Sequence, residues 1–311
     1  MKVLLTGCNG LVGQKLAELF IQCNTFELIM TSRNEQSPFE DEKLMYRQLD
    51  ITNKKMVRTV LDEIEPEVII NAAAIADVDA CERDRASAWQ TNAAGVENLA
   101  HSAKIVGASI VQISTDYIFD GKSGPYEEED RANPINYYGK TKLAAENILR
   151  TSGISYTILR TSFLYGAGFE TKSNFPLRVI EALDAGEQVK APDDQFSNPT
   201  LANDVAYGAL RILETKKSGI YNIAGPTWLN RYEFAQLIAT EFGYDKKKIV
   251  PVKMSSHKLL APRPLKSGFV TLKATVDLGL TTTSIEQGLM MLKSQIKEFR
   301  TSTEETKNKT K

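Results

Sequence analysis

Apolar residues follow two different periods along the first half of the chain, and together they predict alternating strands and helices. Short apolar runs bounded by polar residues or glycine predict strands at 2–7, 26–32, 44–50, 67–74, 109–115 and 155–166. Between these runs, apolar residues recur at helical spacing, which predicts helices at 11–22, 53–65, 86–107 and from Gly139 onward. Strands that alternate with helices indicate an α/β fold, in which helices cover both faces of a doubly wound parallel sheet.

The alternation becomes looser after about residue 166, which predicts a second, smaller unit. Helices are still predicted there at 173–187 and 231–243, and a strand that returns to the first sheet is predicted at 219–225. We therefore predict a first domain at 1–165 with a returning segment at about 198–226, and a smaller interleaved lobe at 166–300. The polar residues 301–311 are predicted to be a disordered tail.

Charge and composition exclude several classes of protein. The net charge is −1, so the chain lacks the basic field that nucleic acids or anionic membranes would require. No apolar run approaches the ~20 residues of a membrane span, and the N-terminal apolar run stops at Gly7, too early for a signal peptide. Three scattered cysteines and two histidines favour a reducing cytoplasm and no metal site.

The first strand leads into the first helix through a glycine-rich loop, "TGCNGLVG", which contains Gly7, Gly10 and Gly13. Glycine allows positive φ and lets backbone amides approach a pyrophosphate, whose charge the helix N-terminus favours. The loop therefore predicts a dinucleotide site in the first domain. A turn that only permits packing is the alternative. The candidate ligands of the cofactor here are Gly7, Asn9, Gly10, Leu11, Val12 and Gly13.

The ends of the second and third strands carry candidate contacts for the adenosine half of the dinucleotide. A site that prefers NAD usually has an acid after the second strand, but this chain has Ser32-Arg33. The forked donors and charge of Arg33 suit a 2′-phosphate, so we predict NADPH, with NADH and a solvated surface arginine as the alternatives. Asp50 and Ile51, after the third strand, are predicted to contact the adenine.

The helix at "YYGKTK" contains two tyrosines followed by two lysines, and helical spacing separates them. Residues four apart share a helix face, which pairs Tyr138 with Lys142 and leaves Tyr137 and Lys140 as neighbours. The spacing alone is weak evidence, because Tyr244 and Lys248 repeat it in a charged turn. An ordinary amphipathic helix with one wet face is the alternative.

Several motifs, in order, carry a resemblance to a known family. "TGCNGLVG", "NAAA", "ISTDYIFDG" and "YGKTK" resemble the extended short-chain dehydrogenase/reductase superfamily. "STDYIFDG", "NPINYYGKTKLAAE", "DQFSNPT" and "APRPLKSG" resemble its dTDP-4-dehydrorhamnose reductase family, over residues 1 to about 280. The resemblance implies a Rossmann-type fold with a substrate-facing lobe. It also implies NADPH-dependent reduction of the 4-keto group of a nucleotide-linked deoxysugar, dTDP-4-dehydrorhamnose to dTDP-L-rhamnose.

The resemblance also implies roles for three catalytic residues. Tyr138 matches the tyrosine that donates a proton to the substrate carbonyl oxygen. Lys142 matches the lysine that binds the nicotinamide ribose, and its ammonium would lower the pKa of the phenol from about 10. Thr115 matches the hydroxyl residue that hydrogen-bonds the reacting oxygen.

Further positions follow from the same resemblance. Asp116 lies at the substrate site, and Phe163 stands where well-known members have Trp, keeping an aromatic shelf for the sugar without the indole donor. Asn92 is either a residue that supports the site or a packing asparagine. Small residues that let the cofactor lie close are Ala72, Ala73 and Ala74.

Two other classes of function remain open at this point. One is another nucleotide-sugar enzyme; a dehydratase is disfavoured because Tyr117 follows Asp116 where dehydratases have Glu, whereas an epimerase stays open. The other is a non-catalytic subunit resembling the methionine adenosyltransferase β subunit. The partners predicted are a nucleotide-sugar substrate and a second copy of the chain in a homodimer.

Overall fold

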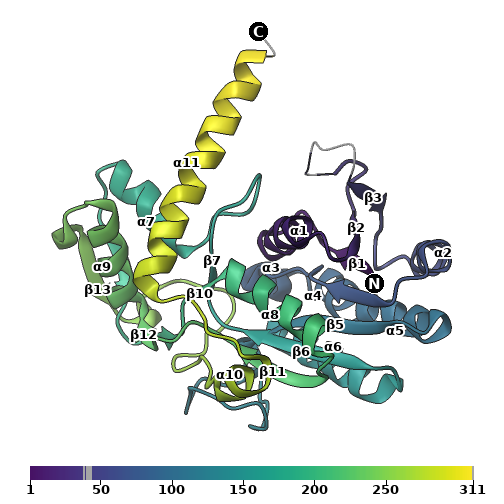
Figure 1. The fold of residues 1–311 in the computed structure, drawn as a ribbon. Coiled ribbons are helices and arrows are strands. Elements are labelled where there is room, and N and C mark those ends of the chain that lie inside the picture. Colours follow the sequence, from purple (N-terminus) through teal and green to yellow (C-terminus); the bar gives the residue numbers. More distant parts are fainter. Residues whose placement is uncertain (38, 40–43, 310–311) are drawn as a thin grey trace.

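A seven-stranded parallel sheet forms the centre of the protein in a computed structural model, which describes residues 1–37, 39 and 44–309 (Figure 1). Its spatial order is β11-β6-β5-β4-β1-β2-β3. The strands are β1 (Lys2–Thr6), β2 (Glu27–Ser32), β3 (Met45–Gln48), β4 (Val68–Asn71), β5 (Ser109–Thr115), β6 (Tyr156–Thr161) and β11 (Gly219–Ile223). The predicted α/β, doubly wound fold is confirmed.

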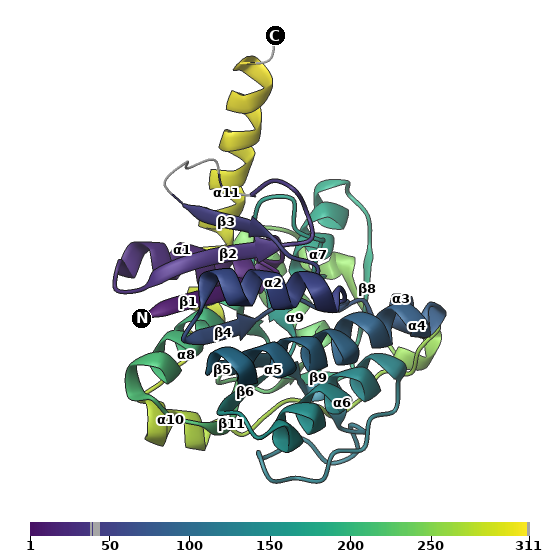
Figure 2. The ribbon, with the colours of Figure 1, turned by 90° about the vertical axis from the view of Figure 1, so that its right-hand side faces the viewer.

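Helices cover both faces of the sheet, because alternate strand residues are apolar on each side. On one face, α1 (Leu11–Cys23) packs beside α8 (Ala202–Thr215). On the other face lie α2 (Lys54–Ile64), α5 (Gly95–Val106) and α6 (Tyr137–Ser152) (Figures 1 and 2). Each face buries its own apolar cluster, so neighbouring residues of β1 such as Leu4 and Leu5 belong to different clusters.

The strand order reverses next to β1, which creates the crevice where such sheets bind ligands. β1 pairs with β2 on one side and with β4 on the other, with Thr6 opposite both Thr31 and Asn71. On the far side of β4, Thr115 at the end of β5 lies opposite Thr161 at the end of β6. The loops after these strands therefore meet at one edge of the sheet.

A smaller lobe packs around its own apolar core at that edge. Three helices form most of it: α7 (Phe175–Asp184), α9 (Arg231–Phe242) and α11 (Ile285–Lys309). Two-stranded sheets pair β7 (Leu164–Tyr165) with β10 (Thr200–Leu201), β8 (Val189–Pro192) with β13 (Ile249–Val252), and β9 (Phe196–Ser197) with β12 (Leu229–Asn230). α10 (Leu272–Leu278) lies beside α8 and β11.

Two segments differ from the sequence analysis. The predicted helix at 86–107 is divided into α4 (Arg85–Trp89), a π-helical turn η1 (Gln90–Ala94) and α5, after a short α3 (Val78–Arg83). The predicted disordered tail is helical to Lys309, because α11 continues without a glycine or proline after Gly288, and 310–311 lie outside the described residues. Short 3₁₀ turns are η2 (Asp116–Ile118), η3 (Lys246–Lys248) and η4 (Met254–Ser256).

Candidate active site

The glycine-rich loop is built by close backbone contacts that only glycine permits. Gly7 has φ +72°, and a Cβ there would lie 2.6 Å from the backbone nitrogen of Ala73. A Cβ on Gly13 would collide with the carbonyl oxygen of Gly7. These two glycines therefore hold β1, α1 and the loop after β4 against one another, so the packing explanation applies to them whether or not a cofactor binds.

Gly10 has a different role, because it caps α1 without a side chain. It is the N-cap residue in extended geometry, and no side chain of the described residues caps the helix there. The first backbone N–H groups of α1, on Leu11 and Val12, therefore point from a free helix N-terminus. A helix N-terminus of this kind suits a pyrophosphate, so the residues present fit a dinucleotide.

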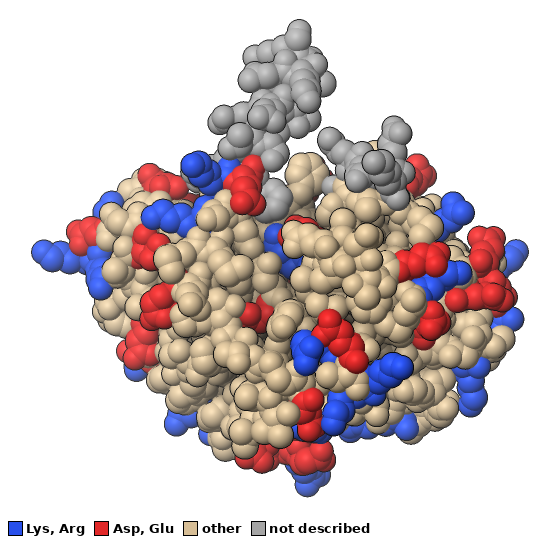
Figure 3. All heavy atoms as spheres, in the orientation of Figure 1, with Lys and Arg blue, Asp and Glu red and all other residues tan. Residues whose placement is uncertain are grey.

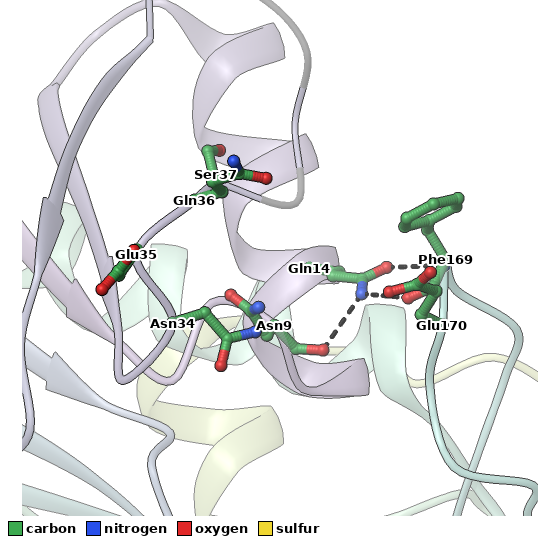
Figure 4. Close-up of a pocket in the computed structure, with 8 residues that line it drawn as sticks. All are labelled: Asn9, Gln14, Asn34, Glu35, Gln36, Ser37, Phe169 and Glu170. Carbon is green, nitrogen blue, oxygen red and sulfur yellow. Dashed lines mark hydrogen bonds between the residues drawn. The ribbon is translucent and has the colours of Figure 1, made fainter.

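A polar hollow of about 640 Å³ lies outside the glycine loop (Figure 4). The side-chain amide of Gln14 joins the two sides of this hollow. It donates to the carbonyl oxygens of Asn9 at 3.1 Å and Phe169 at 2.7 Å, and it accepts from the Phe169 N–H at 2.8 Å. The segment at Phe169 is thus tethered beside the glycine loop, a contact that the sequence analysis missed. The remaining lining residues are Asn34, Glu35, Gln36, Ser37 and Glu170.

The candidate adenosine contacts are placed in part by their own hydrogen bonds. Ser32 is buried, with its hydroxyl 2.8 Å from that of Tyr46, whereas Arg33 is exposed directly after β2. The Asp50 carboxylate accepts the Thr52 N–H and hydroxyl. Ile51 is buried in the apolar core of its sheet face. The roles of these four residues toward the cofactor stay predictions.

A cavity of about 280 Å³ lies at the carboxyl ends of β4, β5 and β6. Tyr138, Lys142 and Thr115 line it together, although they come from α6 and β5. Ala72 and Ala74, after β4, line it as well. The predicted pair and the predicted hydroxyl therefore share one cavity, in the crevice that the strand order creates.

The N-terminus of α6 determines which tyrosine faces this cavity. The helix begins at Tyr137, earlier than the predicted Gly139, because the Asn136 side chain caps it by accepting Gly139 N–H at 2.9 Å. The same amide donates to the carbonyl oxygen of Pro262 at 3.0 Å. Tyr137 turns toward Arg85, whose guanidinium lies over its ring, away from the cavity lining.

Lys142 is buried, and its ammonium has a definite partner. Nζ donates to the carbonyl oxygen of Ile113 at 2.7 Å, and the side chain is only 4% exposed. Burial lowers the pKa of Lys142 to about 8, and the carboxylate of Glu146, one helical turn further along, opposes this shift. Lys140, by contrast, is exposed.

Tyr138 is half-buried, and its environment favours the protonated phenol. Burial raises the pKa of Tyr138 above its ordinary value, and the Thr115 hydroxyl lowers it in part by hydrogen bonding. Burial therefore sets the direction of the shift in the pKa of Tyr138, opposite to the lowering that the sequence analysis predicted from Lys142. The ring of Tyr117 packs edge-on against Tyr138, with centroids 5.9 Å apart.

Asn92 connects the cavity loop to α6. Its side chain is 1% exposed and accepts Ile75 N–H at 2.8 Å, while its amide donates to the Ile75 carbonyl and to the Thr141 hydroxyl, each at 3.0 Å. Asn92 lies in the π-helical turn η1, which aims its side chain at both segments. It holds the loop after β4 against the helix that carries Tyr138 and Lys142.

A family model described as "RmlD substrate binding domain" matches residues 1–298. The chain belongs to this family.

Individual proteins resemble the chain over 81% to 94% of its length. The dTDP-4-dehydrorhamnose reductase of Aggregatibacter actinomycetemcomitans is 32% identical over 94% of this chain and 98% of its own. The solved dTDP-4-dehydrorhamnose reductase of Bacillus anthracis, in complex with NADP, is 31% identical with a TM-score of 0.80, covering 94% of this chain and 98% of that chain. Methionine adenosyltransferase 2 subunit beta of Bos taurus is 30% identical over 81% of this chain and 75% of its own.

The wall of the cavity around Asp116 is assembled from distant segments. Asp116 is 2% exposed, and its Oδ2 accepts the hydroxyls of Ser162 at 2.8 Å and Ser267 at 2.5 Å. The Thr115 hydroxyl lies 3.3 Å from Oδ1 of the same carboxylate and donates to it. Burial raises the pKa of Asp116 from its ordinary value. The two serines were not found from the sequence, because Ser267 is 151 positions from Asp116.

Phe163 lines the cavity, but not as the simple aromatic shelf that the sequence analysis predicted. The guanidinium of Arg231, the first residue of α9, lies over its ring. Phe175 and Phe234 pack against the ring as well. A planar cation therefore covers one face of Phe163. Arg231 had no motif to mark it in the sequence.

A wider cleft of about 790 Å³ adjoins the small cavity and shares Phe163 and Arg231 with it. Its other lining cations include Lys172, Arg178 and Lys190, which are exposed. On the face drawn in Figure 3, Lys and Arg are interspersed with Asp and Glu. In the described part of the chain, no helix combines the length and the apolar character needed to cross a membrane.

Proposed function

We propose that this protein is an NADPH-dependent oxidoreductase that reduces the 4-keto group of dTDP-4-dehydrorhamnose to give dTDP-L-rhamnose. The observation that carries the proposal is the shared cavity of Tyr138, Lys142 and Thr115, at the sheet edge beside a free helix N-terminus. The reductases named among its relatives, one of them solved with NADP, support the same reaction.

The residues around the glycine loop would hold the cofactor. The N–H groups of Leu11, Val12 and Gly13 suit the pyrophosphate, and Arg33 suits the 2′-phosphate. Ala72 and Ala74 line the cavity beside Val12 and leave room for the cofactor, whereas Ala73 packs against the core on one face of the sheet. Bound NADPH supplies the hydride; the chain supplies binding, orientation and the proton.

Tyr138 is the proton donor in this proposal. Its phenol, with an ordinary pKa of about 10 that burial raises further, is protonated at neutral pH and transfers that proton to the substrate carbonyl oxygen. The Thr115 hydroxyl donates to Asp116 in this structure, so we propose that it turns its single proton to the same carbonyl oxygen when the substrate binds. Lys142 lies one turn from Tyr138, where its ammonium holds the nicotinamide ribose and stabilises the phenolate that remains after transfer.

The relative named as a methionine adenosyltransferase subunit supports a second candidate, a non-catalytic partner subunit. Conservation of the fold does not decide between the two. The cavity with its tyrosine, lysine and threonine favours the enzyme, because it places a proton donor beside the cofactor site; a partner subunit that binds NADPH can keep the same residues, so turnover decides between the two. An epimerase on the same fold is the remaining alternative.

The test is NADPH oxidation, followed at 340 nm, against a panel of nucleotide-linked 4-ketosugars and their reduced forms. Rapid oxidation with dTDP-4-dehydrorhamnose, and slower oxidation with other nucleotides or sugars, supports the proposal. Interconversion of two sugars without net oxidation would identify an epimerase. No turnover with any member, together with tight NADPH binding, would favour the partner subunit.

Location and assembly are part of the same proposal. We place the reaction in the cytoplasm, where NADPH and nucleotide sugars are available and where Cys8, Cys23 and Cys81, all free thiols, would stay reduced. The predicted homodimer is retained. Light scattering of the purified chain measures its mass in solution, and a monomer at working concentration would remove the dimer from the account.

A further inference from the structure

Arg231 occupies an unusual position for a cation. It is the first residue of α9, its side chain is 8% exposed, and it lines both the small cavity and the wider cleft. The backbone fixes it there: Asn230 and Glu233 form a capping box at the helix start, and Arg231 N–H donates to the Gln195 carbonyl at 3.1 Å. The guanidinium is therefore held at the junction of the two spaces.

The guanidinium is incompletely partnered. Nε donates to Gln195 Oε1 at 3.3 Å, whereas Nη1 is buried and has no hydrogen-bond partner among the described residues. The nearby Asp116 carboxylate accepts hydroxyls from Ser162, Ser267 and Thr115 instead. Burial accordingly lowers the pKa of Arg231 to about 9, with Tyr117 and Asp116 only partly opposing the shift.

A buried cation that lacks a full set of acceptors is destabilising unless a ligand completes it. The Phe163 ring stacks on the plane of the guanidinium, but it offers no oxygen or nitrogen acceptor to the N–H groups. The forked donors of arginine match phosphate and carboxylate oxygens in a two-point contact. The unpartnered Nη1 therefore points to an oxyanion at the junction.

We propose that Arg231 binds the sugar-proximal phosphate of the substrate diphosphate. By anchoring that phosphate, Arg231 positions the keto carbon in the small cavity. This inference rests on the proposed function. One pyranose ring separates carbon 4 from the anomeric carbon that carries the phosphate. The small cavity holds the residues that serve the carbonyl, and the wider cleft has room for the nucleotide, so the phosphate falls where the two spaces meet.

The proposal assigns one buried side chain of the smaller lobe to the diphosphate of the nucleotide sugar. Lys172, Arg178 and Lys190 are exposed along the cleft, where solvent screens their charges, and they can add only a weaker attraction. A carboxylate on the sugar ring is the competing oxyanion for the same guanidinium, and the test below separates the two.

The experiment measures the affinity of the full-length protein for dTDP, for thymidine and for glucuronate by calorimetry. The variants are Arg231→Met, Arg231→Lys and the control Arg131→Met, which removes an exposed arginine that lines neither space and should leave dTDP affinity unchanged. We expect Arg231→Met to weaken dTDP binding by roughly 10- to 100-fold, as for loss of a charged hydrogen bond. Arg231→Lys should recover part of the loss, because it keeps the charge without the fork. Thymidine affinity should change little in any variant.

Three results would overturn the proposal. One is unchanged dTDP affinity in Arg231→Met. Another is an equal loss for dTDP and thymidine with a native melting temperature, which would mean that Arg231 only shapes the cleft. The third is binding of glucuronate that depends on Arg231 while dTDP binding does not. Because none of these readouts needs turnover, failure of the proposed reduction would be seen separately, in the absence of NADPH oxidation.

Discussion

The small cavity has two walls, and they are built in different ways. One wall is a single face of α6, where Tyr138 and Lys142 stand one turn apart beside Thr115 of β5. The other wall brings Asp116, Phe163 and Arg231 together from three separate segments. The first wall, called the reacting wall below, fits proton transfer and cofactor binding. The second, called the recognising wall, fits recognition of the substrate.

The difference shows that residues for the reaction can be predicted from the sequence, whereas residues for substrate specificity depend on the packing of the smaller lobe. A helix face follows from local spacing, so the reacting wall is visible in a few consecutive letters. The recognising wall depends on how the smaller lobe packs on the sheet, which no short motif encodes. Changes to the first wall should therefore affect turnover, and changes to the second should affect which substrate is bound.

The largest expected effect separates the two adjacent tyrosines. Tyr138→Phe removes the proton donor and should lower kcat by about 10²- to 10⁴-fold, with NADPH affinity kept. Tyr137→Phe should lose much less, because Tyr137 turns toward Arg85. Steady-state kinetics of both variants measures this, and comparable losses would mean that the reacting wall is assigned to the wrong side of α6.

The two lysines of α6 provide the next contrast. Lys142→Met removes a buried ammonium and should raise the NADPH KM and lower kcat, by roughly 10- to 100-fold in kcat/KM. Lys140→Met removes an exposed charge worth about 0–1 kcal/mol and should be almost silent. Two silent variants would leave α6 as an ordinary amphipathic helix.

Cofactor choice tests the segment after β2, where Arg33 and Glu35 have opposite charges. Arg33→Ala should lower the ratio of kcat/KM for NADPH over NADH by about tenfold, the scale of one charge-assisted hydrogen bond. Glu35→Gln removes a negative charge beside the polar hollow and should raise that ratio slightly. An unchanged ratio in Arg33→Ala would remove Arg33 from the 2′-phosphate role.

A smaller effect concerns the pH profile. The pKa of Lys142 is about 8, so its ammonium loses a proton as the pH rises through that value, and kcat/KM should fall on the same basic limb. Glu146 favours the charged form, so Glu146→Gln should lower the pKa of Lys142 and move the basic limb to lower pH.

Two controls accompany the Glu146 variant. Glu146 also binds Arg160 through both carboxylate oxygens, so Glu146→Gln can destabilise the fold. The melting temperature of this variant must therefore be measured, and its kinetics recorded at temperatures where it is folded. Glu63→Gln, on exposed α2 surface, should leave the pH profile in place. A basic limb that stays unmoved in Glu146→Gln would show that Lys142 does not govern it.

Much of the reacting wall could be predicted from the sequence because its signals are local. The alternating periods predicted the sheet and its helices, and helical spacing separated Tyr138 from Tyr137. The same spacing at Tyr244 and Lys248 has no such setting: Tyr244 hydrogen-bonds Asp184, and Lys248 Nζ donates to the Gly186 carbonyl at 3.0 Å. Strand position, not spacing, distinguished the two pairs.

The recognising wall could not be predicted because its contacts join residues far apart in the chain. Ser267 reaches Asp116, Gln195 meets Arg231, and Gln14 reaches Phe169 across 155 positions. Phe163 was identified, but its ring is covered by a cation from another helix, which composition and periodicity do not show. The start of α6 was placed two residues late because the cap supplied by Asn136 was not recognised.

The central claim, reduction of a 4-keto sugar by NADPH in this cavity, is tested most directly by following the hydride. The protein is supplied with dTDP-4-dehydrorhamnose and NADPH deuterated at nicotinamide carbon 4, in the transferred position, and the product is examined by NMR. The account predicts that the wild-type protein forms dTDP-L-rhamnose with deuterium at sugar carbon 4, and that Tyr138→Phe forms this product much more slowly. Unconsumed cofactor, or a product without deuterium at that carbon, would contradict it.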